Sequence, residues 1–129
     1  MKKIILLLLV ILLFGCSTPV STVSKELTVD NFRSELTKND LILSSKETAS
    51  ASTIGSLEAY RFKANDVYID YCVFDKSSKE FKLIQTTNNV HIEFGDIKVD
   101  KKAVVKNNIV ILCDEHPEKE KITKIFKSF

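Results

Sequence analysis

The sequence predicts an α+β domain, a small antiparallel sheet with helices packed on one face, in the order α-β-β-β-α-β-β-α. Three observations support this fold class. Short apolar runs rich in β-branched and aromatic residues recur along the chain, most clearly at 67–74 and 109–113. Turn signals such as Asn65-Asp66 and Asn107-Asn108 separate strands without room for a long crossover. The final segment is amphipathic at helical spacing and therefore needs a sheet to cover.

The first half of the domain is expected to hold one helix and three strands. Thr28 is a suitable N-cap for a helix at about 28–38, because the apolar residues that follow it recur near helical spacing. Strands near 41–49 and 56–64 form a predicted hairpin, with Gly55 between them. The strand at 67–74 is apolar on both faces, which is typical of a central strand.

The second half is expected to begin with a short helix at about 78–87. Ser77 and Glu80 have the spacing of a capping box, and Phe81 and Ile84 lie on one helical face. Strand segments are expected after it, at 91–94, 97–105 and 109–113, with a turn at Asn107-Asn108 before the last one.

The chain then continues into a helix for which Pro117 suits the first position. Its apolar residues follow the i, i+3, i+4, i+7 pattern of one stripe, namely Ile122, Ile125, Phe126 and Phe129. Lysines on its polar side would also suit an anionic lipid surface. We expect a structural helix that covers the sheet, because the apolar strand before it otherwise exposes one face to water.

The N-terminal segment is expected to be an export signal. The apolar run Ile4 to Phe14 has 11 residues, whereas a membrane-spanning helix needs about 20. It follows Lys2-Lys3, which gives the basic head and apolar middle of a secretory signal. It ends in Leu13-Phe14-Gly15-Cys16, which resembles the lipobox of bacterial lipoproteins, although Phe14 is bulkier than is usual there. The resemblance implies cleavage before Cys16 and a diacylglyceryl group on its sulfur.

These features predict a signal peptide at 1–15, a lipid anchor and polar tether at 16–25, and a single α+β domain at 26–129. Two or more acyl chains, such as palmitate, hold a protein durably on a membrane. The expected location is the outer face of a bacterial plasma membrane, because a composition heavy in Lys, Ile and Asn is typical of low-GC Gram-positive cells. In a Gram-negative cell, Ser17 resembles the residue that permits transfer to the outer membrane.

Two longer stretches, "YRFKANDVYIDYCVFDKSSKEFK" and "VVKNNIVILCDEHPEKEKITKIF", resemble small lipid-anchored proteins of low-GC Gram-positive bacteria. The shared features are an Asn-marked turn, a last apolar strand and a final helix rich in Lys and Ile. The resemblance implies the fold and the compartment, and it implies no catalytic residue.

The charge balance argues against nucleic acid as a partner. Without Lys2 and Lys3, the 19 basic side chains become 17, equal to the 17 acidic ones. Binding to a phosphate backbone requires a surplus of Lys and Arg, and the chain has only two arginines. We expect a monomer that contacts the membrane through its lipid and that has an envelope protein as its possible partner.

Two groups of residues have side chains that could bind a metal ion or transfer protons. Cys113, Asp114, Glu115 and His116 are adjacent in the chain, and His91 and Glu93 share a strand face. A second spaced ligand pair is missing from the sequence, and His116 also suits a helix cap. We therefore expect no metal, no cofactor and no catalytic residue; with Gly55 and Gly95 alone in the mature chain, a glycine-rich phosphate loop is also not expected.

The remaining cysteines and the aromatic residues leave alternatives open. Cys72 and Cys113 each lie in an apolar run, which favours two buried thiols and also permits one disulfide. The aromatic residues of two neighbouring predicted strands are expected in the core or, alternatively, on an exposed strip for a partner; they are Tyr60, Phe62, Tyr68, Tyr71 and Phe74.

The sequence as a whole favours a membrane-anchored extracytoplasmic lipoprotein that acts as a non-enzymatic binding or envelope-accessory module. One alternative is a small envelope hydrolase or metal-dependent enzyme that uses His91, Glu93, Cys113 and His116. Another is an inhibitor-like module. A polar pocket containing all four residues would favour the enzyme, and scattered positions with one exposed apolar patch would favour binding.

Overall fold

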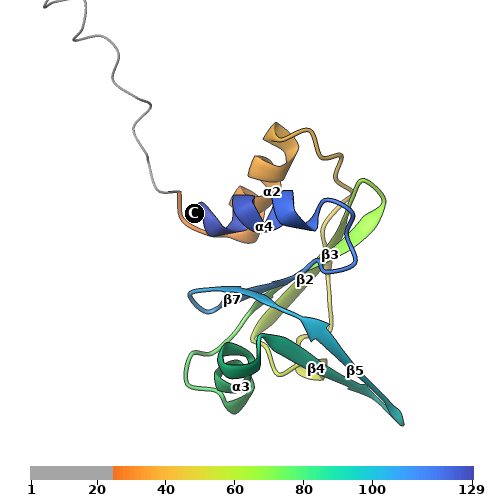
Figure 1. Ribbon diagram of the computed structural model, residues 1–129, viewed down its shortest axis with the longest axis vertical. Helices are drawn as coiled ribbons and strands as arrows, with labels where there is room; N and C mark the ends of the chain where they lie inside the picture. The colour runs from red at the N-terminus through yellow and green to blue at the C-terminus, as the bar shows by residue number, and fades with distance from the viewer. Residues whose placement is uncertain (1–24) are drawn as a thin grey trace, which may run out of the picture.

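The computed structural model describes residues 25–129 (Figure 1). Cys16 and the predicted signal lie outside the described residues, so the lipobox stays a prediction. Within 25–129, each helix is too short or too polar to cross a membrane.

The fold is α+β, as predicted, and the predicted order of elements is confirmed. Its main sheet is antiparallel and has five strands in the order β1-β2-β3-β7-β6. These are β1 (Glu47–Thr48), β2 (Glu58–Ala64), β3 (Val67–Val73), β7 (Ile109–Leu112) and β6 (Val104–Lys106). A separate two-stranded hairpin joins β4 (Asn89–Phe94) to β5 (Ile97–Lys102). The helices are α2 (Val29–Lys38), α3 (Lys79–Thr87) and α4 (Lys119–Lys127), with a short 3₁₀ turn, η1 (Ala51–Thr53).

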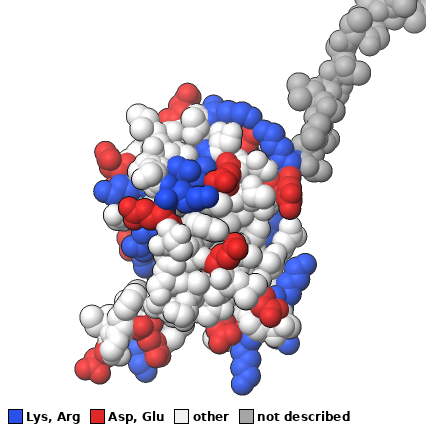
Figure 2. All heavy atoms as spheres, turned by 180° about the vertical axis from the view of Figure 1, so that it is seen from behind, with Lys and Arg blue, Asp and Glu red and all other residues white. Residues whose placement is uncertain are grey.

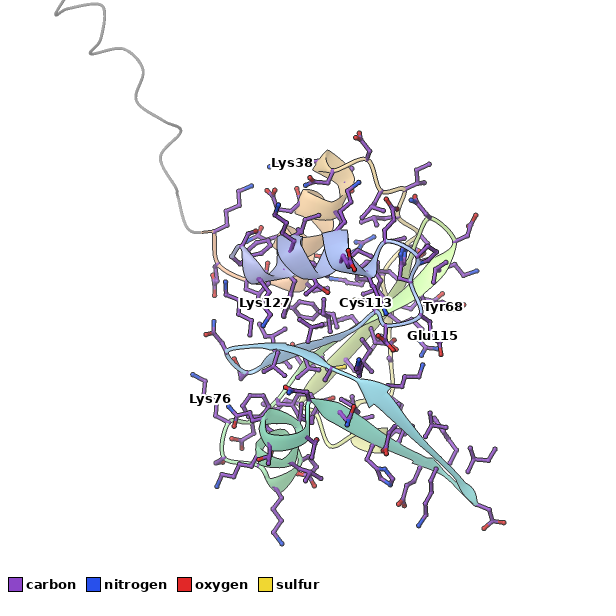
Figure 3. All side chains as sticks on the ribbon, in the orientation of Figure 1. Lys38, Tyr68, Lys76, Cys113, Glu115 and Lys127 are labelled. Carbon is purple, nitrogen blue, oxygen red and sulfur yellow. The ribbon has the colours of Figure 1, made fainter. Side chains whose placement is uncertain are left out.

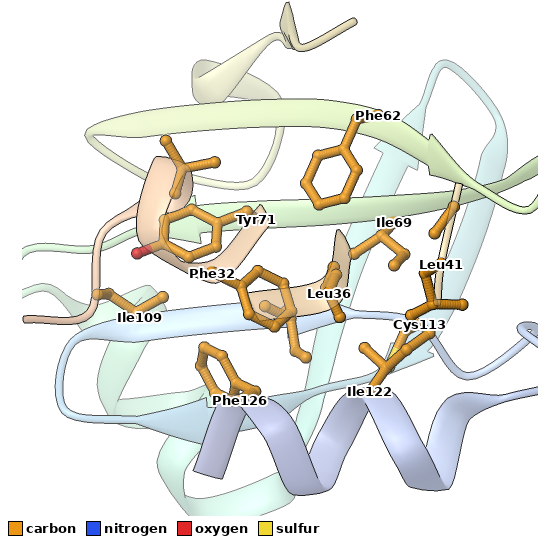
Figure 4. Close-up of a cluster of buried hydrophobic side chains, with 13 residues drawn as sticks. Phe32, Leu36, Leu41, Phe62, Ile69, Tyr71, Ile109, Cys113, Ile122 and Phe126 are labelled. Carbon is orange, nitrogen blue, oxygen red and sulfur yellow. The ribbon is translucent and has the colours of Figure 1, made fainter. Parts of the chain in front are cut away.

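Helices α2 and α4 pack together on one face of the main sheet (Figure 1). The Phe32 ring lies at the centre of this layer, with its centroid 5.6 Å from Phe126 of α4 and 6.4 Å from Phe62 of β2. Figure 4 shows these rings interleaved with Tyr71 and Ile122 between the helices and the sheet. The terminal helix is therefore a structural cover, as the sequence analysis expected.

The opposite face of the sheet is covered in part by α3 and the hairpin. Phe74 follows β3 and stacks on Phe81 of α3 with ring centroids 5.8 Å apart. Ala59, Cys72, Val110 and Leu112 supply the sheet side of this second core. The prediction that the helices pack on one face of the sheet is therefore correct for α2 and α4. The third helix lies on the other face, because Phe74 points there and the chain leaves β3 on that side.

The predicted strand at 97–105 is divided in two. Ala103 donates a backbone hydrogen bond to Asn88 O at 2.8 Å, so residue 103 points toward β4. Backbone groups of successive strand residues point to opposite sides, and Val104 and Lys106 accordingly pair with β7. Strand β4 therefore pairs with β5 on one side of this stretch, and β7 pairs with β6 on the other side.

The predicted strand at 41–49 is mostly irregular in the structure. Only Glu47–Thr48 forms a strand, and a lone bridge joins Leu43 to Ala64. Side chains replace part of the backbone ladder, because Asn65 Oδ1 accepts from Ile42 N at 2.9 Å and Ser44 Oγ accepts from Lys63 N at 2.8 Å.

The helix starts confirm one predicted cap and correct two others. Thr28 Oγ1 accepts from Asn31 N at 3.1 Å, as expected of an N-cap. The second helix is capped by Ser78, not by Ser77, because the Asp75 carboxylate holds Ser77 in a turn before the helix. Helix α4 begins at Lys119 rather than at Pro117.

Both ends of the described chain lie at one end of the molecule. Lys25 and Phe129 line the same small hollow beside α2. The β4–β5 hairpin projects from the opposite side, away from α2 and α4 (Figure 1). A chain that continues before Lys25 therefore joins the domain far from the hairpin.

Candidate functional site

The second face of the sheet is left open at one end, where β2 and β3 present polar side chains. Arg61 and Asp70 lie opposite each other and form an ion pair of 2.7 Å. The guanidinium of Arg61 and the ammonium of Lys63 both lie over the Tyr68 ring, at 4.9 Å and 5.0 Å from its centroid. The Tyr68 side chain remains 50% exposed, so this corner offers an aromatic surface flanked by cations.

The hairpin has one apolar face, formed by alternate residues of its two strands. Val90 at its base is buried against the sheet. Phe94 and Ile97 face each other across the tip and are 62% and 63% exposed. Val99 is 40% exposed beside them. The apolar face is thus buried against the sheet at the base of the hairpin and exposed to solvent at its tip.

A groove of about 400 Å³ lies between the hairpin and the sheet. Its apolar wall comes from Ile92, Phe94 and Val99, and its floor includes Arg61 and Asp70. A second hollow of about 360 Å³ continues from it past Tyr68 and Glu115. Five residues line both hollows and make them continuous: Arg61, Asp70, Val99, Lys101 and Leu112. In Figure 3, Tyr68 and Glu115 lie on the same side of the molecule, and both line the second hollow.

The polar face of the hairpin carries His91, which the sequence analysis had singled out together with Glu93. His91 Nε2 lies 3.0 Å from Glu93 Oε1, so the predicted same-face pair is present. His91 Nδ1 lies 2.6 Å from Asp100 Oδ1 on β5. Hydrogen bonds to Asp100 first and to Glu93 second raise the pKa of His91 above its usual value. The sequence analysis missed Asp100, which only the hairpin register places opposite His91.

His116, the other histidine, is buried and serves the packing of α4. Its Nδ1 accepts a hydrogen bond from Glu118 N at 2.9 Å. That leaves the ring proton on Nε2, which donates to Ala64 O at 2.7 Å. His116 is therefore structural and holds the turn before α4, but it is not the helix cap that the sequence suggested, because the N-cap residue is Glu118 and no side chain caps this helix.

The four residues of the enzyme alternative do not meet in one site. Cys113 lies beneath α4 (Figure 3), where its Sγ is 3.9 Å from Thr123 Oγ1. His116 is buried before this helix, against Ala64 of β2. His91 and Glu93 lie on the hairpin, and the two nitrogens of His91 point to different carboxylates. Among residues 25–129, no group of His, Cys, Asp and Glu is arranged to hold a metal ion.

Cys72 and Cys113 are both free and buried. They belong to opposite faces of the sheet, Cys113 under α4 and Cys72 over α3, which leaves them unpaired in the described structure. Burial raises the pKa of Cys72 to about 12 and also raises the pKa of Cys113. Neither thiol has the electropositive, exposed setting of a nucleophile.

The aromatic cluster predicted from the strands is divided between core and surface. Phe62 and Tyr71 are buried under α2 and α4, and Phe74 is buried against α3. Tyr60 is half-buried at the edge of the first core. Tyr68 alone of the five is exposed, so no contiguous aromatic strip is formed.

Charged side chains of both signs are interspersed on the face shown in Figure 2. This distribution agrees with the equal numbers of acidic and basic residues predicted for the mature chain. The features open to a ligand are therefore the groove and the uncovered apolar tip of the hairpin. No protein-family model, curated protein or solved structure matches the chain.

Proposed function

We propose that this protein is a lipid-anchored, extracytoplasmic binding module of a bacterial envelope, with its binding surface at the β4–β5 hairpin and the groove beside it. The observation that carries the proposal is the relative position of the two ends of the molecule. Lys25, which follows the predicted anchor, lies beside Phe129, whereas the hairpin projects from the opposite side.

The anchoring part of the proposal rests on Leu13-Phe14-Gly15-Cys16. Acyl chains on Cys16 supply membrane affinity at about 0.8 kcal/mol for each buried methylene. The domain then needs no membrane-binding surface of its own. This agrees with the burial of Ile122 and Phe126, the central residues of the amphipathic stripe of α4.

The binding part of the proposal rests on the surface of the hairpin. Large apolar residues that stay exposed together are a mark of an interaction site, and Phe94 and Ile97 form such a pair at the tip. The groove combines an apolar wall with the Arg61–Asp70 ion pair, which gives a ligand both a surface to cover and groups that orient it.

Anchoring is tested by growing cells with a fatty-acid probe. The parent chain is expected to incorporate the label, and Cys16→Ala is expected to remain an unlabelled, uncleaved precursor. Cys72→Ala is the matched control and is expected to label like the parent, because Cys72 is buried in the domain. Equal labelling of Cys16→Ala and the parent would refute the anchor.

Binding at the hairpin is tested by placing a photo-crosslinking amino acid at position 97 and, as a control, at position 83. Ile97 and Leu83 are both exposed apolar residues, on the hairpin tip and on α3 respectively. We expect defined adducts in the envelope from position 97 and much weaker ones from position 83. The same pattern of adducts from both positions would contradict a binding surface at the hairpin.

A further inference from the structure

The outer edge of β5 pairs with no other strand among the described residues, and the second hollow lies beside its residues 99–102. Ala103 points toward β4, and the alternation of backbone groups places residues 97, 99 and 101 on the same side. The backbone N–H and C=O groups of Lys98, Asp100 and Lys102 therefore point away from β4. Strand β7 occupies this side only from Val104 onward. Within the described residues, β5 is thus a sheet edge of six residues with one unpaired row.

We propose that β5 pairs antiparallel with β5 of a second copy, about a two-fold axis that passes through Val99. This register places each Lys98 opposite Asp100 of the second copy. It also places each Asp96 opposite Lys102 of the second copy. All four cross-strand pairs join opposite charges. Lys98, Asp100 and Lys102 have outward-pointing backbone groups, and Asp96 lies in the turn just before β5.

The neighbouring registers are unfavourable for the same side chains. An axis at Asp100 puts the two Asp100 carboxylates together and each Lys98 against Lys102, and an axis at Lys98 puts the two Lys98 side chains together. Like charges directly opposite destabilise a strand pair. An axis at Lys101 brings the two Lys101 ammonium groups together. It also requires each Lys98 to pair with Val104 of the second copy, whose outward backbone groups already pair with β7. An axis at Ile97 would pair Lys98 only with Asp96 of the turn before β5. Among the registers that pair more than the first two residues of β5, the charge pattern therefore selects the one at Val99.

The pairing also covers apolar surface that the isolated domain leaves exposed. Two copies of Val99 contact each other at the axis, and Ile97 lies opposite the methylene chain of Lys101 in the second copy. The two hairpins become one four-stranded sheet with a continuous apolar face. A two-fold contact of this kind is closed and does not continue into a fibre. It also covers a sheet edge that would otherwise be free to pair with strands of other chains.

This inference does not rest on the proposed function, because the edge and its charges belong to the domain itself. The pairing would replace the monomer expected from the sequence, which does not reveal the unpaired edge of β5. Anchoring would assist the pairing, since confinement to a membrane raises the effective concentration of the two copies.

The test uses the full chain in membranes and the variant Val99→Cys. Residues that face each other in a non-hydrogen-bonded antiparallel pair have Cα atoms about 4.5 Å apart, which suits a disulfide. Glu93→Cys is the matched control, an exposed position on the other strand of the hairpin. After mild oxidation, we expect a dimer on a non-reducing gel from Val99→Cys and little from Glu93→Cys or from the parent chain. Absence of the dimer, or equal amounts from both variants, would overturn the proposal.

Charge reversal tests the register in the Val99→Cys chain. Lys98→Asp alone and Asp100→Lys alone each place like charges opposite each other and are expected to reduce the dimer several-fold. The double variant places an aspartate at position 98 opposite a lysine at position 100 of the second copy. Opposite charges are thus paired again, and the dimer is expected to recover. Circular dichroism shows whether each variant remains folded, which is needed because Lys98 and Asp100 also contact Glu93 and His91 within the hairpin. Unchanged dimer in the single variants, or none in the double variant, would contradict the register.

Discussion

Arg61 and Asp70 lie directly opposite each other on β2 and β3 and are joined at two points, Nε to Oδ1 at 2.7 Å and Nη2 to Oδ2 at 3.1 Å. The Asp70 side chain is only 14% exposed, while Arg61 is 44% exposed. The pair lies where the groove and the second hollow meet. It therefore orders the open corner of the sheet and offers a ligand a fixed guanidinium.

A double-mutant cycle at Arg61 and Asp70 is expected to show favourable coupling of about 1 kcal/mol in the free energy of unfolding, because the contact has two-point geometry and one partner is shielded from water. Urea unfolding of Arg61→Ala, Asp70→Ala and the double variant measures it. Lys63→Ala, on the same strand face, is the control, with an expected change within about 0.5 kcal/mol. A coupling of zero would show that the pair is only a surface contact.

Phe126→Ala is expected to destabilise the domain by about 3 to 5 kcal/mol, because Phe126 is fully buried and its ring contacts Phe32. The midpoint of thermal or urea unfolding of the fragment 25–129 measures this. Leu83→Ala should leave the midpoint nearly unchanged, since Leu83 is 55% exposed. An unchanged midpoint for Phe126→Ala would mean that α4 is not a structural cover.

The central strand and the terminal helix were predictable because each carries its own local signal. The run of β-branched and aromatic residues at Val67–Val73 and the apolar stripe through Ile122 and Phe126 depend on nearby residues alone. The turns at Asn65-Asp66 and Asn107-Asn108 were also predictable. Asn and Asp tolerate positive φ at low cost, and three of these four residues adopt it.

The candidate site was predictable only in part, because its contacts depend on strand register. Glu93 is two residues from His91 in the chain, and the sequence places both on one strand face. Asp100 lies opposite His91 only because of the hairpin register. The split between β5 and β6 had no local signal either, since it follows from Ala103 pointing to β4 and Val104 to β7. The open edge and the groove follow from that split.

Titration of His91 should show a pKa above 6.5, because the protonated ring is stabilised by Asp100 and then by Glu93. A pKa raised on folding means that these contacts contribute stability that is fully present below pH 6.5 and is lost as the pH rises through the folded-state value. NMR of the His91 ring protons measures the midpoint. Asp100→Asn is expected to lower it, and Glu93→Gln to lower it less. A midpoint at or below 6.5 in the parent chain would contradict the geometry.

Cys72 and Cys113 should resist alkylation in the folded domain at neutral pH. Both thiols are buried, and the pKa of Cys72 is raised to about 12, so thiolate is scarce. Mass spectrometry after treatment with iodoacetamide should find the fragment 25–129 unmodified when folded. In urea it should gain two labels, one on each cysteine. Rapid labelling of the folded chain, or a disulfide in place of two thiols, would disprove the packing of these residues.

The anchor is tested most directly by the mass of the N-terminal peptide of the protein purified from its own membranes. The predicted result is a peptide that begins at Cys16, lacks residues 1–15 and carries a diacylglyceryl group on the cysteine sulfur. Treatment with lipase should reduce its mass by the acyl chains, which distinguishes the lipid from other additions. A peptide that still begins at Met1, or one that begins at Cys16 with an unmodified thiol, would contradict the proposal that the domain acts from a lipid anchor.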